Sequence, residues 1–140
     1  MEILRTPDKY FDNLEDYPFE PNYIDIEHHD QTLRMHYLDE SSESEEIVLL
    51  MHGEPTWSYL YRKIIPILVS NGKRVIAPDL IGFGKSDKPT AREDYSYANH
   101  IKWVETLIQK LDLKNITFFA HDWGGLIGLR LLAKYPDLYD

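Results

Sequence analysis

Three short, almost uninterrupted apolar runs constrain the fold of this chain more than any other feature. They are Ile47–Met51, Val75–Ala77 and Ile116–Ala120. A strand that is apolar without alternation is typical of a parallel sheet, because helices cover both of its faces. Helical patterns lie between and after these runs. Strands that alternate with helices predict an α/β fold with a mostly parallel central sheet.

Two segments nearer the N-terminus have a different pattern. Tyr23–Glu27 and Leu33–Tyr37 alternate apolar and polar residues, which is typical of strands with one covered face. We expect them to form an antiparallel pair at the edge of the sheet, joined near Asp30 and Gln31. The acidic stretch Asp39–Glu46 is predicted to be a solvated turn between strands.

The helices are predicted from apolar spacing. One helix follows Ser96, a suitable N-cap, and its apolar residues are Ile101, Val104, Leu107, Ile108 and Leu111. A second helix is predicted over Tyr59–Val69, with Pro66 ending or kinking it. A third, mostly apolar helix follows Asp122 and stops near Pro136.

The predicted sheet is incomplete on its C-terminal side. The run Ile116–Ala120 has the composition of an interior strand, yet only one helix follows it before Asp140. An apolar strand at an open edge promotes aggregation. We therefore expect residues 1–140 to be the N-terminal part of a single core domain, truncated from a longer polypeptide.

Composition excludes several classes of function. Acidic residues outnumber basic ones by 24 to 15, for a formal charge of −9, which argues against nucleic acid or an anionic membrane as a partner. There are no cysteines, so a thiol nucleophile and disulfides are excluded. The six histidines have no metal-site spacing, and we expect neither metal nor cofactor. Without a secretory signal or a long apolar run, a cytoplasmic protein is the default expectation.

The strongest functional motif is Phe118–Leu126, a buried strand followed by a sharp turn and a helix. Small residues, Ala120, Gly124 and Gly125, surround Asp122 at the turn. This is the pattern of a nucleophile on a strained corner, where small neighbours let strand and helix approach closely. A carboxylate nucleophile can displace a leaving group from saturated carbon and form an alkyl ester. The alternative is that Asp122 is an ordinary helix N-cap.

A second motif, Met51–Trp57, directly follows the first buried strand. A loop at this place supplies one oxyanion-hole amide, and the residue after the nucleophile supplies the other. By position these are the backbone N–H groups of Glu54 and Trp123. The alternative is an ordinary turn shaped by Gly53 and Pro55.

The remaining conspicuous residues are predicted to be structural. Pro78–Asp87 fits no phosphate-binding pattern, and its Asp79 and Asp87 are expected to accept from local backbone amides. Trp57 is predicted to pack beside the oxyanion loop, and His28 and His29 to lie in a polar turn. His52 and His121 adjoin key positions but receive no catalytic role.

These motifs, in this order, resemble the haloalkane dehalogenases of the α/β-hydrolase superfamily, in particular the 1,2-dichloroethane-type subfamily. The resemblance is most specific at Glu54–Lys63 and at the turn around Asp122. It implies that Asp122 is the nucleophile and that the indole of Trp123 holds the departing halide. It also implies hydrolysis of a small halogenated hydrocarbon by water, giving a primary alcohol and halide.

The family's lid, second halide-binding residue, catalytic acid and base histidine would all lie beyond residue 140. We therefore expect the 140-residue chain alone to give no turnover. Two alternatives stay open: an epoxide hydrolase with the same aspartate, against which Glu54 argues, and an inactive truncated remnant.

Overall fold

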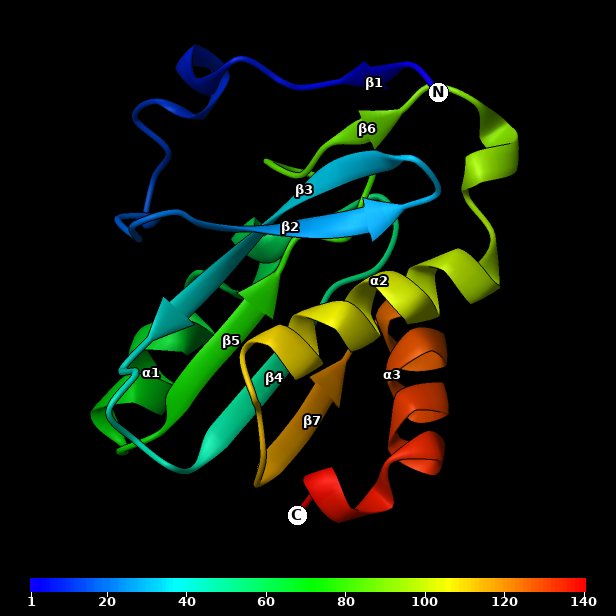
Figure 1. Cartoon of the computed structure of the whole chain (residues 1–140). Helices are drawn as coiled ribbons and strands as arrows, with labels where there is room; N and C mark the ends of the chain where they lie inside the picture. The colour runs from blue at the N-terminus through cyan, green and yellow to red at the C-terminus, as the bar shows by residue number, and fades with distance from the viewer.

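The central sheet has five strands in the order β2-β3-β5-β4-β7 (Figure 1). The computed structural model describes residues 1–140, and the strands are β2 (Asn22–His28), β3 (Gln31–Glu40), β4 (Ile47–Met51), β5 (Arg74–Pro78) and β7 (Ile116–Ala120). β4 is parallel to β5 and β7. β2 and β3 form the predicted antiparallel edge pair, and β3 is antiparallel to β5. The prediction of an α/β fold with an antiparallel N-terminal pair is confirmed.

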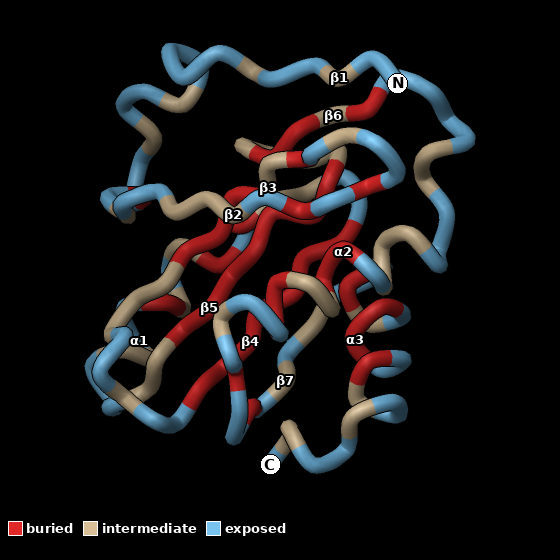
Figure 2. The backbone as a smooth tube through the Cα atoms, in the orientation of Figure 1, coloured by how far each residue is buried: buried red, intermediate tan, exposed pale blue.

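Strand β4 explains why an uninterrupted apolar run was needed at this point of the chain. Its alternate residues enter two separate cores: Ile47, Leu49 and Met51 enter one, and Val48 and Leu50 enter the other. All five residues are buried, as the red segment at the centre of Figure 2 shows. A strand in this position has no solvent face on which to place polar residues.

Three α-helices cover the sheet. α1 (Ile64–Ser70) contributes to the core on one face, whereas α2 (Tyr97–Lys110) and α3 (Trp123–Lys134) contribute to the core on the other. The N-cap prediction for α2 is confirmed, because the Ser96 hydroxyl accepts a hydrogen bond from the Asn99 amide at 3.1 Å. None of these helices has both the length and the apolar character needed to cross a lipid bilayer.

The shorter elements are β1 (Ile3–Leu4), which pairs with β6 (Lys88–Pro89), and four 3₁₀ turns. These turns are η1 (Asp8–Phe11), η2 (Ser58–Tyr61), η3 (Arg92–Asp94) and η4 (Pro136–Leu138). Arg5 anchors the N-terminal segment through two hydrogen bonds to Asp87, at 2.6 and 2.9 Å.

The predicted helix over Tyr59–Val69 is divided in the structure. A 3₁₀ turn over Ser58–Tyr61 is followed by α1 from Ile64, and Pro66 lies in the first turn of α1 rather than at its end. A proline is tolerated there, because the first N–H groups of a helix have no intrahelical acceptor.

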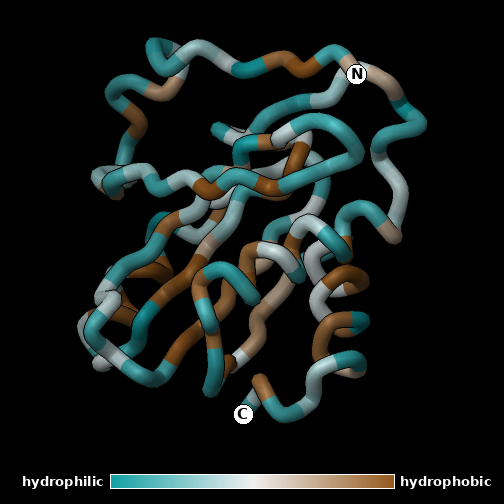
Figure 3. The backbone as a smooth tube through the Cα atoms, viewed as in Figure 1, coloured by the Kyte–Doolittle hydropathy of each residue, from teal (hydrophilic) through white to brown (hydrophobic).

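Two further expectations, that β7 is buried on both faces and that His28 lies in a polar turn, were wrong. β7 is an edge strand, and Thr117 and Phe119 face solvent, so it is not buried on both faces. α3, hydrophobic along much of its length (Figure 3), likewise exposes Leu126 and Leu129. His28 is not in a polar turn: it is buried in β2, and its Nδ1 accepts the Trp103 indole N–H at 3.3 Å.

Candidate active site

Asp122 lies at the corner between β7 and α3, in a backbone conformation that residues other than glycine rarely adopt. Its φ is 57° and its ψ is −126°, outside the regions that L-residues ordinarily occupy. Asp122 occupies the N-cap position of α3, but its side chain makes no capping hydrogen bond. Its carboxylate oxygen Oδ2 instead accepts the Glu54 backbone N–H at 3.0 Å. The carboxylate is thus directed at the loop that carries Glu54, and an ordinary N-cap role does not account for this contact.

The two backbone amides singled out in the sequence meet at this carboxylate. Hydrogen bonds from the N–H groups of Trp123 and Glu54 hold the pKa of Asp122 below its ordinary value. Donors that favour the charged form of a carboxyl group lower its pKa. Asp122 is therefore an ionised carboxylate at neutral pH, held by the two backbone N–H groups that the sequence analysis singled out.

Glycines make this close approach possible. A Cβ on Gly53 would lie 2.4 Å from the Cβ of Asp122, and one on Gly124 would lie 2.4 Å from the carbonyl oxygens of Met51 and His52. Gly125, which also belonged to the small-residue pattern, has no atom within 4 Å of such a Cβ. A Cβ on Gly128, which the sequence analysis did not single out, would lie 1.9 Å from the Phe118 ring. Gly53, Gly124 and Gly128 are the glycines that the corner requires.

The structural roles predicted beside the site agree with the observed contacts in most cases. Trp57 stacks on Tyr59 with ring centroids 5.6 Å apart. His52 is buried, and its ring bonds to Leu80 N–H and to the Gly53 carbonyl oxygen. Asp87 differs from the prediction, because its partners are the distant Arg5 and the Arg34 amide.

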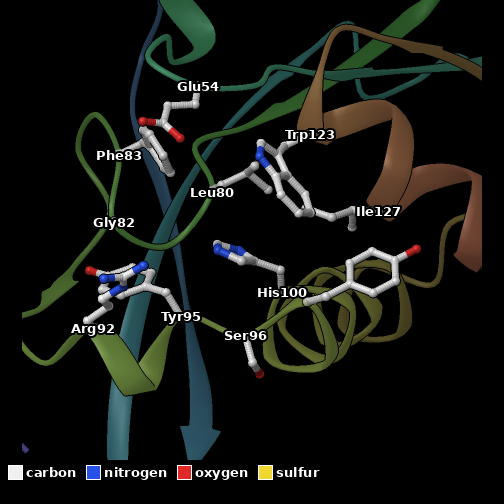
Figure 4. Close-up of a pocket in the computed structure, with 11 residues that line it drawn as sticks. Glu54, Leu80, Gly82, Phe83, Arg92, Tyr95, Ser96, His100, Trp123 and Ile127 are labelled. Atoms are coloured by element: carbon white, nitrogen blue, oxygen red, sulfur yellow. The ribbon is translucent and has the colours of Figure 1, made fainter.

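A cavity of about 510 Å³ adjoins the corner (Figure 4). Glu54 and Trp123 line it together with nine other residues: Leu80, Gly82, Phe83, Arg92, Tyr95, Ser96, Tyr97, His100 and Ile127. The indole of Trp123 projects into this space (Figure 4) and is 44% exposed. Its N–H donates to no group of the protein, so it is available to a bound anion.

His100 is a cavity residue that the sequence analysis missed. Burial lowers its pKa to about 4, and its Nδ1 has no hydrogen-bond partner. The residue is therefore a neutral imidazole at the inner wall of the cavity. A signal was present, because His100 lies three and four residues before Trp103 and Val104, both buried on the same face of α2. No group of three or more His, Cys, Asp and Glu side chains is placed to hold a metal ion.

Comparison with known proteins places this geometry in a family. A family model described as the alpha/beta hydrolase fold matches residues 46–138. The chain is 58% identical over 140 residues to a haloalkane dehalogenase of Psychrobacter cryohalolentis, covering 99% of this chain and 46% of that protein. It is 56% identical over 138 residues to a haloalkane dehalogenase of Mycolicibacterium paratuberculosis, covering 98% of this chain and 46% of that protein. The chain thus spans about half the length of the curated relatives it matches.

Solved structures agree with this assignment. The tetrameric haloalkane dehalogenase DpaA from Paraglaciecola agarilytica NO2 superposes with a TM-score of 0.95 at 46% identity, covering 100% of this chain and 47% of that one. The epoxide hydrolase VrEH1 from Vigna radiata superposes with a TM-score of 0.71 at 30% identity, covering 86% of this chain and 39% of that one. The resemblance to haloalkane dehalogenases inferred from the motifs is confirmed. With more than half of its residues matched by the family model, the chain belongs to the alpha/beta hydrolase fold family.

Proposed function

We propose that Asp122 is the nucleophile of a hydrolytic haloalkane dehalogenase, of which this chain provides the nucleophile corner and the oxyanion hole. The single observation that carries the proposal is the position of the Asp122 carboxylate. It lies on a strained corner with its Oδ2 3.0 Å from the Glu54 amide nitrogen. The adjacent indole of Trp123 projects into the cavity with a free N–H. A dehalogenase needs both an ionised carboxylate and a donor for the departing halide.

In the first step a carboxylate oxygen of Asp122 attacks the carbon that bears the halogen. The new C–O bond forms as the carbon–halogen bond breaks, and the halide leaves with the bonding electrons. The indole N–H of Trp123 donates to the halide, in a cavity whose lining includes the apolar side chains of Leu80, Phe83 and Ile127. A hydrogen bond to a charged acceptor is stronger than one between neutral groups.

In the second step water loses a proton to a base and attacks the carbonyl carbon of the alkyl ester, and negative charge develops on the carbonyl oxygen. The amides of Glu54 and Trp123 are placed to stabilise that charge. The bond between that carbon and the alkyl-bearing oxygen then breaks, the alcohol leaves with a proton, and the Asp122 carboxylate is restored. The attacking water needs a base. No histidine ring of these 140 residues hydrogen-bonds to Asp122, so the proposal limits this chain to the first step.

Covalent capture tests the proposal directly. The 140-residue chain is incubated with a reactive primary alkyl bromide or iodide, and its intact mass and peptide masses are measured. We expect one alkyl group per chain, located on Asp122, together with one equivalent of released halide. Sustained halide release would instead show that this chain can also hydrolyse the ester.

Two variants complete the experiment. Asp122→Asn removes the nucleophile, and we expect it to give no adduct. Asp137→Asn alters an exposed aspartate far from the corner and is expected to react like the parent chain. Equal alkylation of parent and Asp122→Asn chains would exclude Asp122 as the nucleophile.

A second candidate is an epoxide hydrolase, favoured by the likeness to VrEH1. In that case the carboxylate would open an epoxide ring, and the ring oxygen would have to be protonated by a neighbouring acid. Exposing the chain to an epoxide and to an alkyl bromide in parallel separates the two. We expect the bromide to give the adduct and the epoxide to give none. A cytoplasmic location remains a prediction.

A further inference from the structure

A buried ionisable pair lies outside the residues assigned to the reaction. The Nδ1 of His36, in β3, is 2.8 Å from Oδ2 of Asp79, which follows β5. Both side chains have no exposed surface. Burial by itself would raise the pKa of Asp79, but hydrogen bonds from His36 and from the Lys85 amide outweigh it and keep the pKa low. A buried carboxylate of this kind is costly unless its acceptor capacity is used.

The contacts of Asp79 lead to the oxyanion loop. Its Oδ1 accepts the Ser58 backbone N–H at 2.7 Å, and its Oδ2 also accepts the Lys85 N–H at 2.9 Å. Ser58 directly follows the segment that carries Glu54. A Cβ on Gly84 would lie 2.4 Å from Asp79 Oδ2 and 2.9 Å from Trp57 Cβ, so the turn presses closely on the end of this loop.

The beginning of the same loop is held by Leu80, the residue after Asp79. His52 is buried, and its Nε2 accepts the Leu80 backbone N–H at 2.9 Å. Its Nδ1 lies 2.9 Å from the Gly53 carbonyl oxygen, so the ring carries its proton on Nδ1. Burial also lowers the pKa of His52, which keeps Nε2 free to accept. Asp79 and Leu80 are consecutive, and together they fasten both ends of residues 52–58.

We propose that this Asp79–Leu80 corner is a clamp that positions the Glu54 amide against Asp122, with His52, Asp79 and His36 as positioning residues. The inference deepens the proposed function and rests on it for its catalytic meaning. The clamp matters because the Glu54 N–H contacts the carboxylate at 3.0 Å. A displacement of about 1 Å is enough to lose an oxyanion-hole contact.

The clamp is tested with two amide substitutions that differ by one methylene. In His52→Gln the side-chain oxygen can reach the place of Nε2 and still accept the Leu80 N–H. In His52→Asn the shorter side chain ends near the place of Nδ1, and the Leu80 contact is lost. The pKa of Asp122 is measured by carboxyl-carbon NMR, and the Glu54 amide is followed by its proton shift and hydrogen exchange.

We expect His52→Asn to raise the pKa of Asp122 and to make the Glu54 amide exchange about tenfold faster. His52→Gln is expected to keep both values close to those of the parent chain. Asp79→Asn, which loses the charge facing His36, should act in the same direction as His52→Asn. His28→Asn is the matched control, since His28 is equally buried and accepts an N–H far from the loop, and it should leave both values unchanged.

The clamp is refuted if a folded His52→Asn chain keeps the parent values, or if His52→Gln and His52→Asn change them equally. Should Asp79→Asn fail to fold, the comparison of His52→Gln with His52→Asn is sufficient to test the clamp. These measurements need no substrate. Failure of covalent capture would therefore remove the dehalogenase proposal and leave the clamp standing, and failure of the NMR test would do the reverse.

Discussion

At the residue scale, the backbone of Asp122 carries strain that its neighbours must hold. A non-glycine residue at φ 57° and ψ −126° costs about 1–3 kcal/mol relative to an ordinary conformation. The hydrogen bond from Glu54 to its side chain and the fit of Gly53 beneath its Cβ maintain that conformation. Backbone strain of this kind is concentrated at functional sites, which agrees with the role proposed for this carboxylate.

His100 makes the stability of the chain depend on pH. Its pKa falls from 6.5 to about 4 on burial, so the unfolded state binds more protons than the folded state between these values. The stability contributed by the neutral ring is complete above about pH 6.5 and is lost as the pH falls toward 4. Urea unfolding at pH 7 and pH 5 tests this. The parent should lose about 1 kcal/mol more than His100→Gln, and equal losses would contradict the assignment.

At the scale of elements, the first turn of α3 is held unusually close to the carboxyl end of β4. The contact is made at Gly124, where any side chain would meet the backbone oxygens of Met51 and His52. The next residue, Gly125, faces open space. The two adjacent glycines of this motif therefore differ: the close packing of α3 on β4 requires a glycine at position 124 but not at position 125.

Alanine substitutions separate these two glycines. Gly124→Ala forces α3 away from β4, and we expect it to lower the free energy of unfolding by about 1–3 kcal/mol. Gly125→Ala adds a methyl group without a clash, and helix propensity should make it neutral or stabilising by up to about 1 kcal/mol. Urea unfolding midpoints measure both. If Gly125→Ala lowered the free energy of unfolding as much as Gly124→Ala, the close approach of α3 to β4 would not explain the need for glycine at position 124.

At the scale of the whole molecule, the two long edges of the sheet differ. In the second half of β2, exposed Asp25 and Glu27 alternate with buried Ile26 and His28, as in a strand with one covered face. β7 exposes Phe119 (52%), and an isolated bridge between Ile116 and Tyr139 covers only one end of its outer side. Leu126 and Leu129 of α3 add exposed apolar surface. An open apolar edge of this kind favours association with another chain.

We expect the purified 140-residue chain to self-associate as its concentration rises. Phe119→Lys places a charge on the exposed face of β7 and should reduce the association. Tyr10→Lys is the control, because Tyr10 is a similarly exposed aromatic residue (65%) on η1. Sedimentation velocity over a concentration series distinguishes them. If both variants associate like the parent, the edge of β7 is not the contact.

The class of fold, the strand positions and the residue at the corner could all be predicted from the amino-acid sequence. Apolar periodicity depends on which faces are covered, so it located β4 and the N-terminal pair well. The motif spacing also predicted that Glu54, Asp122 and Trp123 come together, since each has a fixed position after a strand of the sheet. It did not separate Gly124 from Gly125 or reveal the break before α1, because those depend on atoms that approach through space.

Which distant groups meet depends on how the whole chain folds. The bonds from Asp79 to His36 and Ser58 join residues separated by 43 and 21 positions, and no local pattern encodes such a pairing. The burial of His28 likewise depends on its contact with Trp103 of α2, 75 positions away. Periodicity reports the environment of a face, whereas hydrogen-bond partners and pKa values are set by the particular atoms that folding brings within about 3 Å.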